Sequence, residues 1–204
     1  MNHAPTENLA LNLGYDREEN LRQLTQVMNE RPEAPYLAQL MASWAAGVGV
    51  LPDGMGLRES EFKDFTRFYF GTDAVEYKSV SGRVFDADRM PETEDLRILL
   101  NRHRKGEQEA EAWVAEVLIS GMLGYDHLWE DMGYWSRKEL SATIQEVFPA
   151  LFEKNDQNMR WKKFIYKQLC IQEEFVYTCR APSCAECVDY SECFAIEEIN
   201  QVKD

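Results

Sequence analysis

The chain has 204 residues and a formal net charge of −14 at pH 7, which fits one domain or one domain with an appendage. The charge argues against nucleic acid as a partner, because neutralising phosphates needs a basic face. No apolar run approaches the roughly 20 residues that span a bilayer, and Met1 to Leu13 lacks the features of a secretory signal. We therefore expect a cytoplasmic protein without membrane partners, whose cysteines are reduced thiols.

The hydrophobic periodicity is helical nearly throughout, which predicts an all-α fold. Asp16 with Glu19 forms a plausible capping box at the start of the first helix, and Pro32 is expected to end that helix. Further helices are expected to carry residues 37–44, 62–69, 96–100, 113–122, 140–148 and 156–172. Residues 72–91 are less regular, with at most a short extended piece at Val80, Val84 and Phe85 and no convincing sheet.

Four of the five cysteines lie within fifteen residues, in the spacing C-x4-C-x2-C-x5-C. They are Cys179, Cys184, Cys187 and Cys193. Thiolates clustered on one short loop can bind zinc or an iron–sulfur cluster. The spacing favours a cluster slightly, because only one C-x2-C pair is present and the tail has no histidine. We predict a helical domain over residues 1–175 and a cysteine-rich, metal-binding tail over residues 176–204.

The last predicted helix is basic and leads to this tail. On a helical wheel Trp161, Phe164, Ile165 and Leu169 share one side, which is the expected core face. Lys163, Tyr166 and Cys170 fall on the opposite side, with Lys167 nearby. Two interpretations stay open for the basic residues, which are either a solvated face or a face that stabilises thiolates, a cluster or an incoming oxyanion. The residues concerned are Arg160, Lys162, Lys163 and Lys167.

Cys170 and His127 are the remaining candidates. Cys170 is either an accessory ligand or a small apolar filler. His127 is either a ligand or proton donor, with Asp126, Glu130 and Asp131 as outer partners, or a histidine at a helix start beside a capping Asp126. We find no nucleophile triad and no phosphate-binding loop in the sequence.

Three blocks in order resemble the NifQ family of nitrogen fixation proteins. The first two are the segments His127-Leu128-Trp129-Glu130-Asp131-Met132-Gly133 and Met159-Arg160-Trp161-Lys162-Lys163-Phe164-Ile165-Tyr166-Lys167-Gln168-Leu169-Cys170. The third is the cysteine motif with Ala181-Pro182-Ser183 before Cys184. The match covers about residues 120–196, whereas residues 1–110 carry no motif that we can match.

The resemblance implies a molybdenum-handling carrier of nitrogenase cofactor assembly rather than an enzyme. It implies that the four motif cysteines bind an iron–sulfur cluster, of 3Fe-4S or 4Fe-4S type, that also carries molybdenum. It further implies a molybdate or molybdenum–sulfur donor, and the NifEN scaffold complex and the NifH iron protein as partners. Two rival hypotheses are a zinc-stabilised helical adaptor and an iron–sulfur redox protein. The roles of Cys170 and His127 do not follow from the resemblance.

Overall fold

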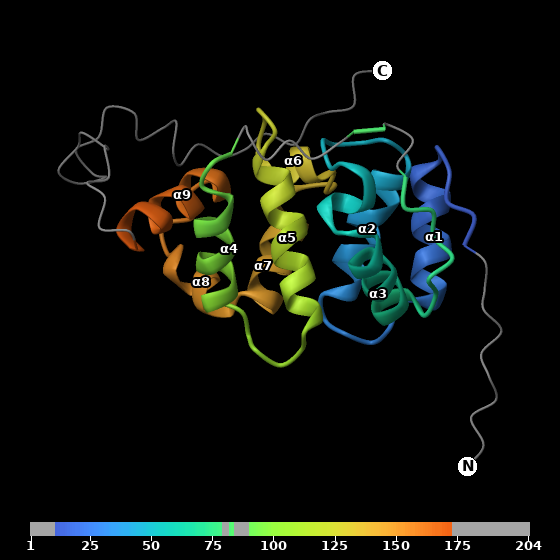
Figure 1. Cartoon of the computed structure of the whole chain (residues 1–204), viewed down its shortest axis with the longest axis horizontal. Helices are drawn as coiled ribbons and strands as arrows, with labels where there is room; N and C mark the ends of the chain where they lie inside the picture. Colours follow the sequence, from blue (N-terminus) through green and yellow to red (C-terminus); the bar gives the residue numbers. More distant parts are fainter. Residues whose placement is uncertain (1–10, 79–81, 84–89, 173–204) are drawn as a thin grey trace, which may run out of the picture.

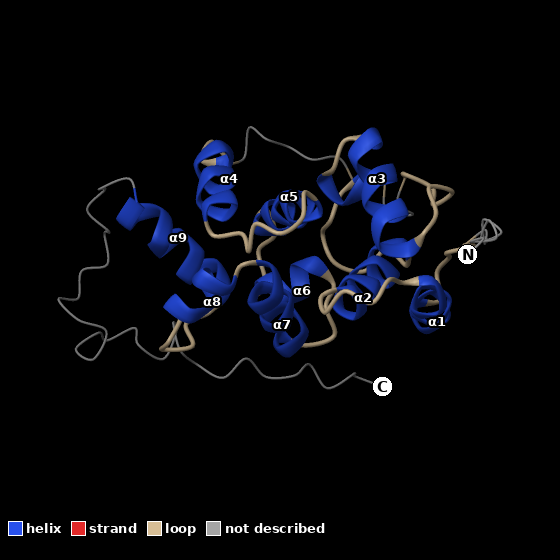
Figure 2. Ribbon diagram, turned by 90° about the horizontal axis from the view of Figure 1, so that it is seen from below, coloured by secondary structure: helices blue, strands red, loops and turns tan. Residues whose placement is uncertain are grey.

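The computed structural model of the chain describes residues 11–78, 82–83 and 90–172. These residues form nine α-helices and one short 3-10 helix and contain no strand, which confirms the all-α prediction for this part of the chain (Figure 2). The elements are α1 (Arg17–Val27), α2 (Ala34–Ala45), η1 (Asp53–Gly56), α3 (Glu59–Phe70), α4 (Thr93–Arg102), α5 (Ala110–Met122), α6 (Leu128–Met132), α7 (Arg137–Val147), α8 (Pro149–Lys154) and α9 (Trp161–Gln172).

The helices lie along an elongated body with α1 at one end and α9 at the other (Figure 1). Helix α2 packs between α1 and α7, and α5 lies in the middle against α3, α4 and α6. Helix α9 packs against α4. The largest fully buried side chains are Tyr69, Phe62, Phe65 and Phe70 of α3, and Phe148 between α7 and α8. Burial of these rings contributes to the hydrophobic stabilisation of the body.

Several helix boundaries follow the local sequence signals. The Asp16 carboxylate accepts hydrogen bonds from the backbone N–H groups of Glu18 and Glu19, both at 3.0 Å, and so caps α1. The Glu19 side chain pairs with Arg22 rather than completing the predicted box. Ser136 caps α7, and Gly71 ends α3 with the left-handed backbone that glycine adopts readily.

The last predicted helix, over residues 156–172, is wrong at its start. Helix α8 ends at Lys154, and α9 begins only at Trp161. Between them Asn158 has a left-handed φ of 54°, and the Asn155 side chain bonds both the N–H and the C=O of Met159 at 2.8 and 2.9 Å. Arg137 of α7 donates to the carbonyls of Asn158 and Met159. This turn redirects the chain and sets where α9 begins.

The end of the first helix differs from the sequence prediction, and part of the irregular segment 72–91 lies outside the described residues. The 3-10 helix η1 lies between α2 and α3, where no helix was predicted, and α1 ends at Val27, before Pro32. Val80, Val84 and Phe85 lie outside the described residues. The described parts of 72–91 contain no strand.

Candidate functional site

The four motif cysteines, from Cys179 to Cys193, lie outside the residues that the structure describes, as does the predicted boundary at 175/176. Among the residues described, no group of three or more His, Cys, Asp or Glu side chains is arranged to hold a metal ion. The prediction that the tail is the metal site therefore stays a prediction. The structure does describe the helix that leads to the tail and the helical block that holds this helix.

Helix α9 presents the core face that the helical wheel predicts. Trp161, Phe164, Ile165 and Leu169 are buried. On the other side Lys163 is exposed, while Lys167 and Cys170 are partly buried. Tyr166 differs from the prediction of an open face, because it packs partly against the core. Its hydroxyl hydrogen-bonds Glu92, just before α4, and burial together with this carboxylate raises the pKa of the phenol.

Lys162 is the basic residue of α9 whose charge has a buried partner. Its Nζ donates to the Asp131 carboxylate of α6 and, at 2.9 Å, to the carbonyl oxygen of Gly124. The Asp131 side chain is 1% exposed and the Lys162 side chain 18%. An ion pair removed from water is costly to break, because the remaining charge is left uncompensated. Lys162 thus fastens the first turn of α9 to the 124–133 segment.

The pocket that receives Asp131 is shaped by Gly124. A Cβ atom at Gly124 would lie 2.1 Å from Cγ of Asp131 and 2.2 Å from its Oδ1. Burial raises the pKa of the Asp131 carboxyl, against the opposing effects of Lys162 and of a hydrogen bond from the backbone of Asp126. Asp131 was predicted as an outer partner of His127. The structure turns it inward to Lys162.

His127 occupies the N-cap position of α6, and its extended backbone marks the helix start. Its carbonyl oxygen accepts the first helical hydrogen bond, from Asp131 N–H at 2.9 Å. The Glu130 carboxylate reaches back to the backbone N–H of His127 at 3.2 Å. Asp126, predicted as the capping residue, instead lies exposed outside the helix. The fold therefore gives His127 a structural position at a partly exposed helix start, and its chemical role stays a prediction.

Two contacts to this block come from residues that sequence reasoning did not select. Val50 N–H donates to the carbonyl oxygen of Asp131 at 2.6 Å. Arg17 Nη2 donates to the carbonyl oxygen of Gly133 at 3.0 Å. Gly49, with a φ of +83°, lies so close that a Cβ there would be 2.6 Å from Asp131 O and 2.9 Å from Gly133 N. The Gly47-Val48-Gly49 sequence, too short to interpret alone, thus marks a close approach of two loops.

Arg160 lies directly before α9 and is partly buried. Its carbonyl oxygen accepts a hydrogen bond from Phe164 N–H at 2.9 Å, which joins Arg160 to the first turn of the helix. Exposed Lys163 and partly buried Lys167 are the other basic residues of α9 besides Lys162, which pairs with Asp131. Of the four basic residues predicted to form this face, Lys162 therefore pairs with a buried carboxylate.

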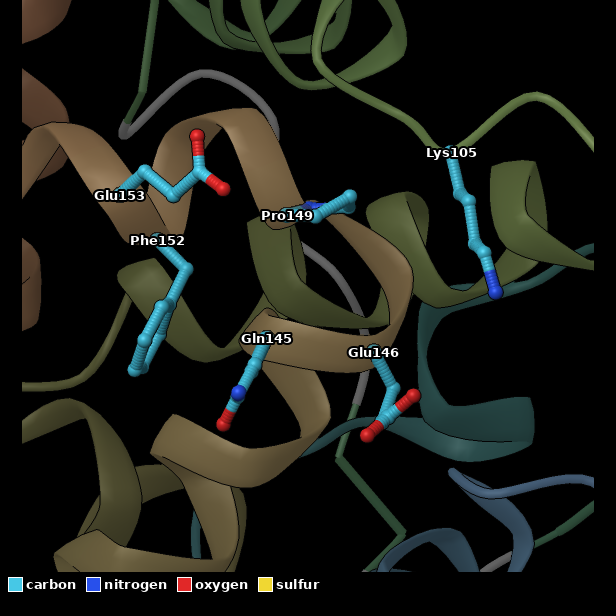
Figure 3. Close-up of a pocket in the computed structure, with 6 residues that line it drawn as sticks. All are labelled: Lys105, Gln145, Glu146, Pro149, Phe152 and Glu153. Atoms are coloured by element: carbon cyan, nitrogen blue, oxygen red, sulfur yellow. The ribbon is translucent and has the colours of Figure 1, made fainter.

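A surface hollow lies at α7 and α8, and neither Asp131 nor Lys162 lines it. It is lined by Lys105, Gln145, Glu146, Pro149, Phe152 and Glu153 (Figure 3). Close to it His103, one of the few buried polar residues, binds the Leu99 carbonyl through Nδ1 and the Lys154 ammonium through Nε2. Both ring nitrogens are thus used within the fold. We assign no function to this hollow.

The described fold and site define an all-helical protein in which a short helix, α6, holds the first turn of α9, and α9 leads to a four-cysteine sequence. None of the described helices has the length and apolarity that a membrane crossing needs. The two helical blocks noted in the sequence, 127–133 and 159–170, are joined in space by Asp131 and Lys162.

The NifQ family profile matches residues 36–195, and the chain belongs to this family, which is implicated in nitrogen fixation. The chain is 36% identical to Protein NifQ of Azotobacter vinelandii, over 84% of this chain and 92% of that protein. It is 32% identical to Protein NifQ of Klebsiella pneumoniae, over 80% of this chain and 99% of that protein. It is 33% identical to the Protein NifQ homolog of Sinorhizobium fredii, over 81% of this chain and 71% of that protein. No solved structure matches the chain.

Proposed function

We propose that the chain is a molybdenum-handling iron–sulfur carrier that delivers molybdenum to synthesis of the nitrogenase iron–molybdenum cofactor. Membership of the NifQ family, with the C-x4-C-x2-C-x5-C sequence inside the matched residues, is the observation that carries the proposal. Thiolates are suitable ligands for iron–sulfur clusters. The proposed ligands are Cys179, Cys184, Cys187 and Cys193.

The positive charge on α9 supports a role in attracting molybdenum as its oxyanion. Arg160, exposed Lys163 and Lys167 give cations at and on α9, the helix that precedes the cysteine tail in the sequence, in a chain whose net charge is −14. An acidic protein would otherwise repel molybdate, so a local basic helix lowers that barrier. Lys162 is left out of this set, because its ammonium is paired with Asp131. The sulfide-rich cluster would supply a soft coordination site for the metal cargo.

The proposed partners are the NifEN scaffold complex and the NifH iron protein, with molybdate or a molybdenum–sulfur compound as donor. A carrier must release its cargo, and a short thiolate loop at the end of a helix suits exchange better than a closed site in the core. Cys170, at the last turn of α9 and partly exposed, is the described thiol closest in sequence to the motif. We propose it as an accessory ligand and His127 as a proton donor.

Anaerobic purification of the full chain followed by metal and sulfide analysis tests the proposal. We expect a brown protein that contains iron and acid-labile sulfide, takes up molybdenum, and passes it to purified NifEN in the presence of NifH. A colourless protein with stoichiometric, non-exchanging zinc would establish the adaptor instead. A cluster that accepts electrons but never holds molybdenum would establish the redox protein.

Single substitutions separate the ligands from the accessory groups. Cys187→Ser is expected to lower iron content strongly, whereas Cys170→Ala and His127→Ala should retain iron and load less molybdenum. Lys163→Gln should slow molybdate uptake more at low salt than at high salt, because exposed charges are screened by ions. Unchanged loading and transfer by both Cys170→Ala and His127→Ala would exclude their proposed roles.

A further inference from the structure

A groove lies between the start of α1 and the turn that follows α6. It is lined by Tyr15, Asp16, Arg17, Glu18 and Trp135. Two of these residues are large aromatics that remain exposed, Tyr15 at 82% and Trp135 at 37%. Tryptophan, tyrosine and arginine are the residues that most often dominate the energy of protein–protein binding. Tyr15 and Trp135, exposed together beside Arg17 in one groove, indicate an interaction surface.

The walls of the groove are held by contacts within the chain. The Arg17 guanidinium lies 4.5 Å from the centroid of the Trp135 ring, and its Nη2 donates to the Gly133 carbonyl. Asp16, as the cap of α1, fixes the backbone of Glu18 and Glu19. A partner would therefore meet a largely ordered surface, which lowers the entropy lost on binding.

The charge of the groove selects the kind of partner. The carboxylates of Asp16 and Glu18 are exposed along it, and the charge of Glu139 acts on Arg17 from α7. The cation among the lining residues, Arg17, is already engaged by Trp135 and Gly133. An arginine or lysine of a partner could lie on Tyr15 and the exposed part of Trp135 while pairing with Glu18. The groove thus suits a basic segment.

The position of the groove connects it with the helix before the cysteine tail. Arg17 binds the carbonyl of Gly133, and two residues earlier Asp131 holds Lys162 of α9. The groove is therefore linked, through the hydrogen bond from Arg17 to Gly133, to the short segment that anchors α9. We infer that this groove docks a basic segment of the protein that accepts molybdenum. This inference rests on the proposed function, in which the accepting protein is the NifEN scaffold complex.

Binding of the full-length chain to immobilised, purified NifEN, without molybdenum, tests the inference by biolayer interferometry. The groove variants are Glu18→Lys, Trp135→Ala and Tyr15→Ala. The matched controls are Glu30→Lys, an exposed carboxylate beyond the other end of α1, and Ile98→Ala, an exposed apolar side chain on α4. Tyr15→Ala is included because a side chain that is 82% exposed can be removed without unfolding the chain. Circular dichroism checks each variant.

We expect Glu18→Lys and Trp135→Ala each to raise Kd about tenfold or more, and the controls to stay within about twofold of the wild type. The effect of Glu18→Lys should shrink at high salt. Equal Kd for groove and control variants, or no binding by the wild type, would overturn the inference. Equal Kd together with normal molybdenum transfer leaves the proposed function standing. If binding to NifEN depends on the groove but no molybdenum is transferred, the proposed carrier function is refuted, while the groove remains a binding surface for NifEN.

Discussion

Replacing Lys162 by methionine is expected to destabilise the chain by about 3 kcal/mol. Breaking a buried ion pair from one side costs about 3–5 kcal/mol, since the other charge stays buried without compensation. The lower end applies because the Lys162 side chain is 18% exposed and the backbone hydrogen bond from Asp126 to Asp131 remains. This loss is a large share of a typical stability of about 5–15 kcal/mol. Urea unfolding at neutral pH, followed by tryptophan fluorescence, measures it.

Two further variants make the reasoning refutable. Lys163→Met removes the neighbouring exposed lysine and should change stability by no more than about 0.5 kcal/mol. Lys162→Met combined with Asp131→Leu replaces the pair by apolar groups of similar shape, and should recover stability to within about 1 kcal/mol of the wild type. If Lys162→Met alone costs no more than Lys163→Met, the pair contributes nothing and the anchoring of α9 is refuted.

The cost of Lys162→Met should also depend on pH. Burial raises the pKa of Asp131 above its ordinary value, and loss of the lysine removes the group that opposes this shift. A carboxyl with a raised pKa in the folded state binds its proton more tightly there than when unfolded. The stability from that proton is present at low pH and lost as pH rises through the folded-state pKa. We expect a smaller cost near about pH 5 than at about pH 8.

Three other substitutions test the site and the tail. Gly124→Ala should destabilise the chain by more than about 1 kcal/mol in urea unfolding, because its Cβ would press on Asp131, whereas Gly14→Ala, which has open space, should be nearly neutral. Cys187→Ser should reduce iron and sulfide content in anaerobic protein, and Cys170→Ser should leave both near the wild-type level. Iron retention by Cys187→Ser would remove this thiolate from the proposed ligand set.

Local signals in the sequence account for much of the described fold. The core face of α9, the cap at Asp16 and the stop at Gly71 each depend on residues within one or two turns, so periodicity and capping rules find them. The start of α9 was missed because it depends on Asn158 in a left-handed conformation and on Arg137, which bonds the turn from another helix. Such long-range contacts leave no local pattern.

The candidate site shows the same limit. A helical wheel can place Lys162 on a face of its helix. It cannot show that Lys162 pairs with a buried carboxylate, Asp131, which lies 31 residues earlier in the chain. The close approach of Gly49 likewise joins loops more than eighty residues apart, and a lone glycine gives no sign of its neighbour. For the cysteine motif the sequence is the more informative source. Its spacing indicates the candidate ligands, whereas the structure does not describe these residues.

The contacts around α6 bear on how the chain can be shortened. The family profile begins at residue 36, yet Arg17, upstream of that limit, supplies a hydrogen bond to Gly133. Val50, in the part without a recognisable motif, supplies another to Asp131. A fragment cut to the motif-bearing half would therefore expose the backbone of the very turn that orients α9. Fragment boundaries for this protein should be set by these hydrogen bonds, not by the extent of the recognisable sequence.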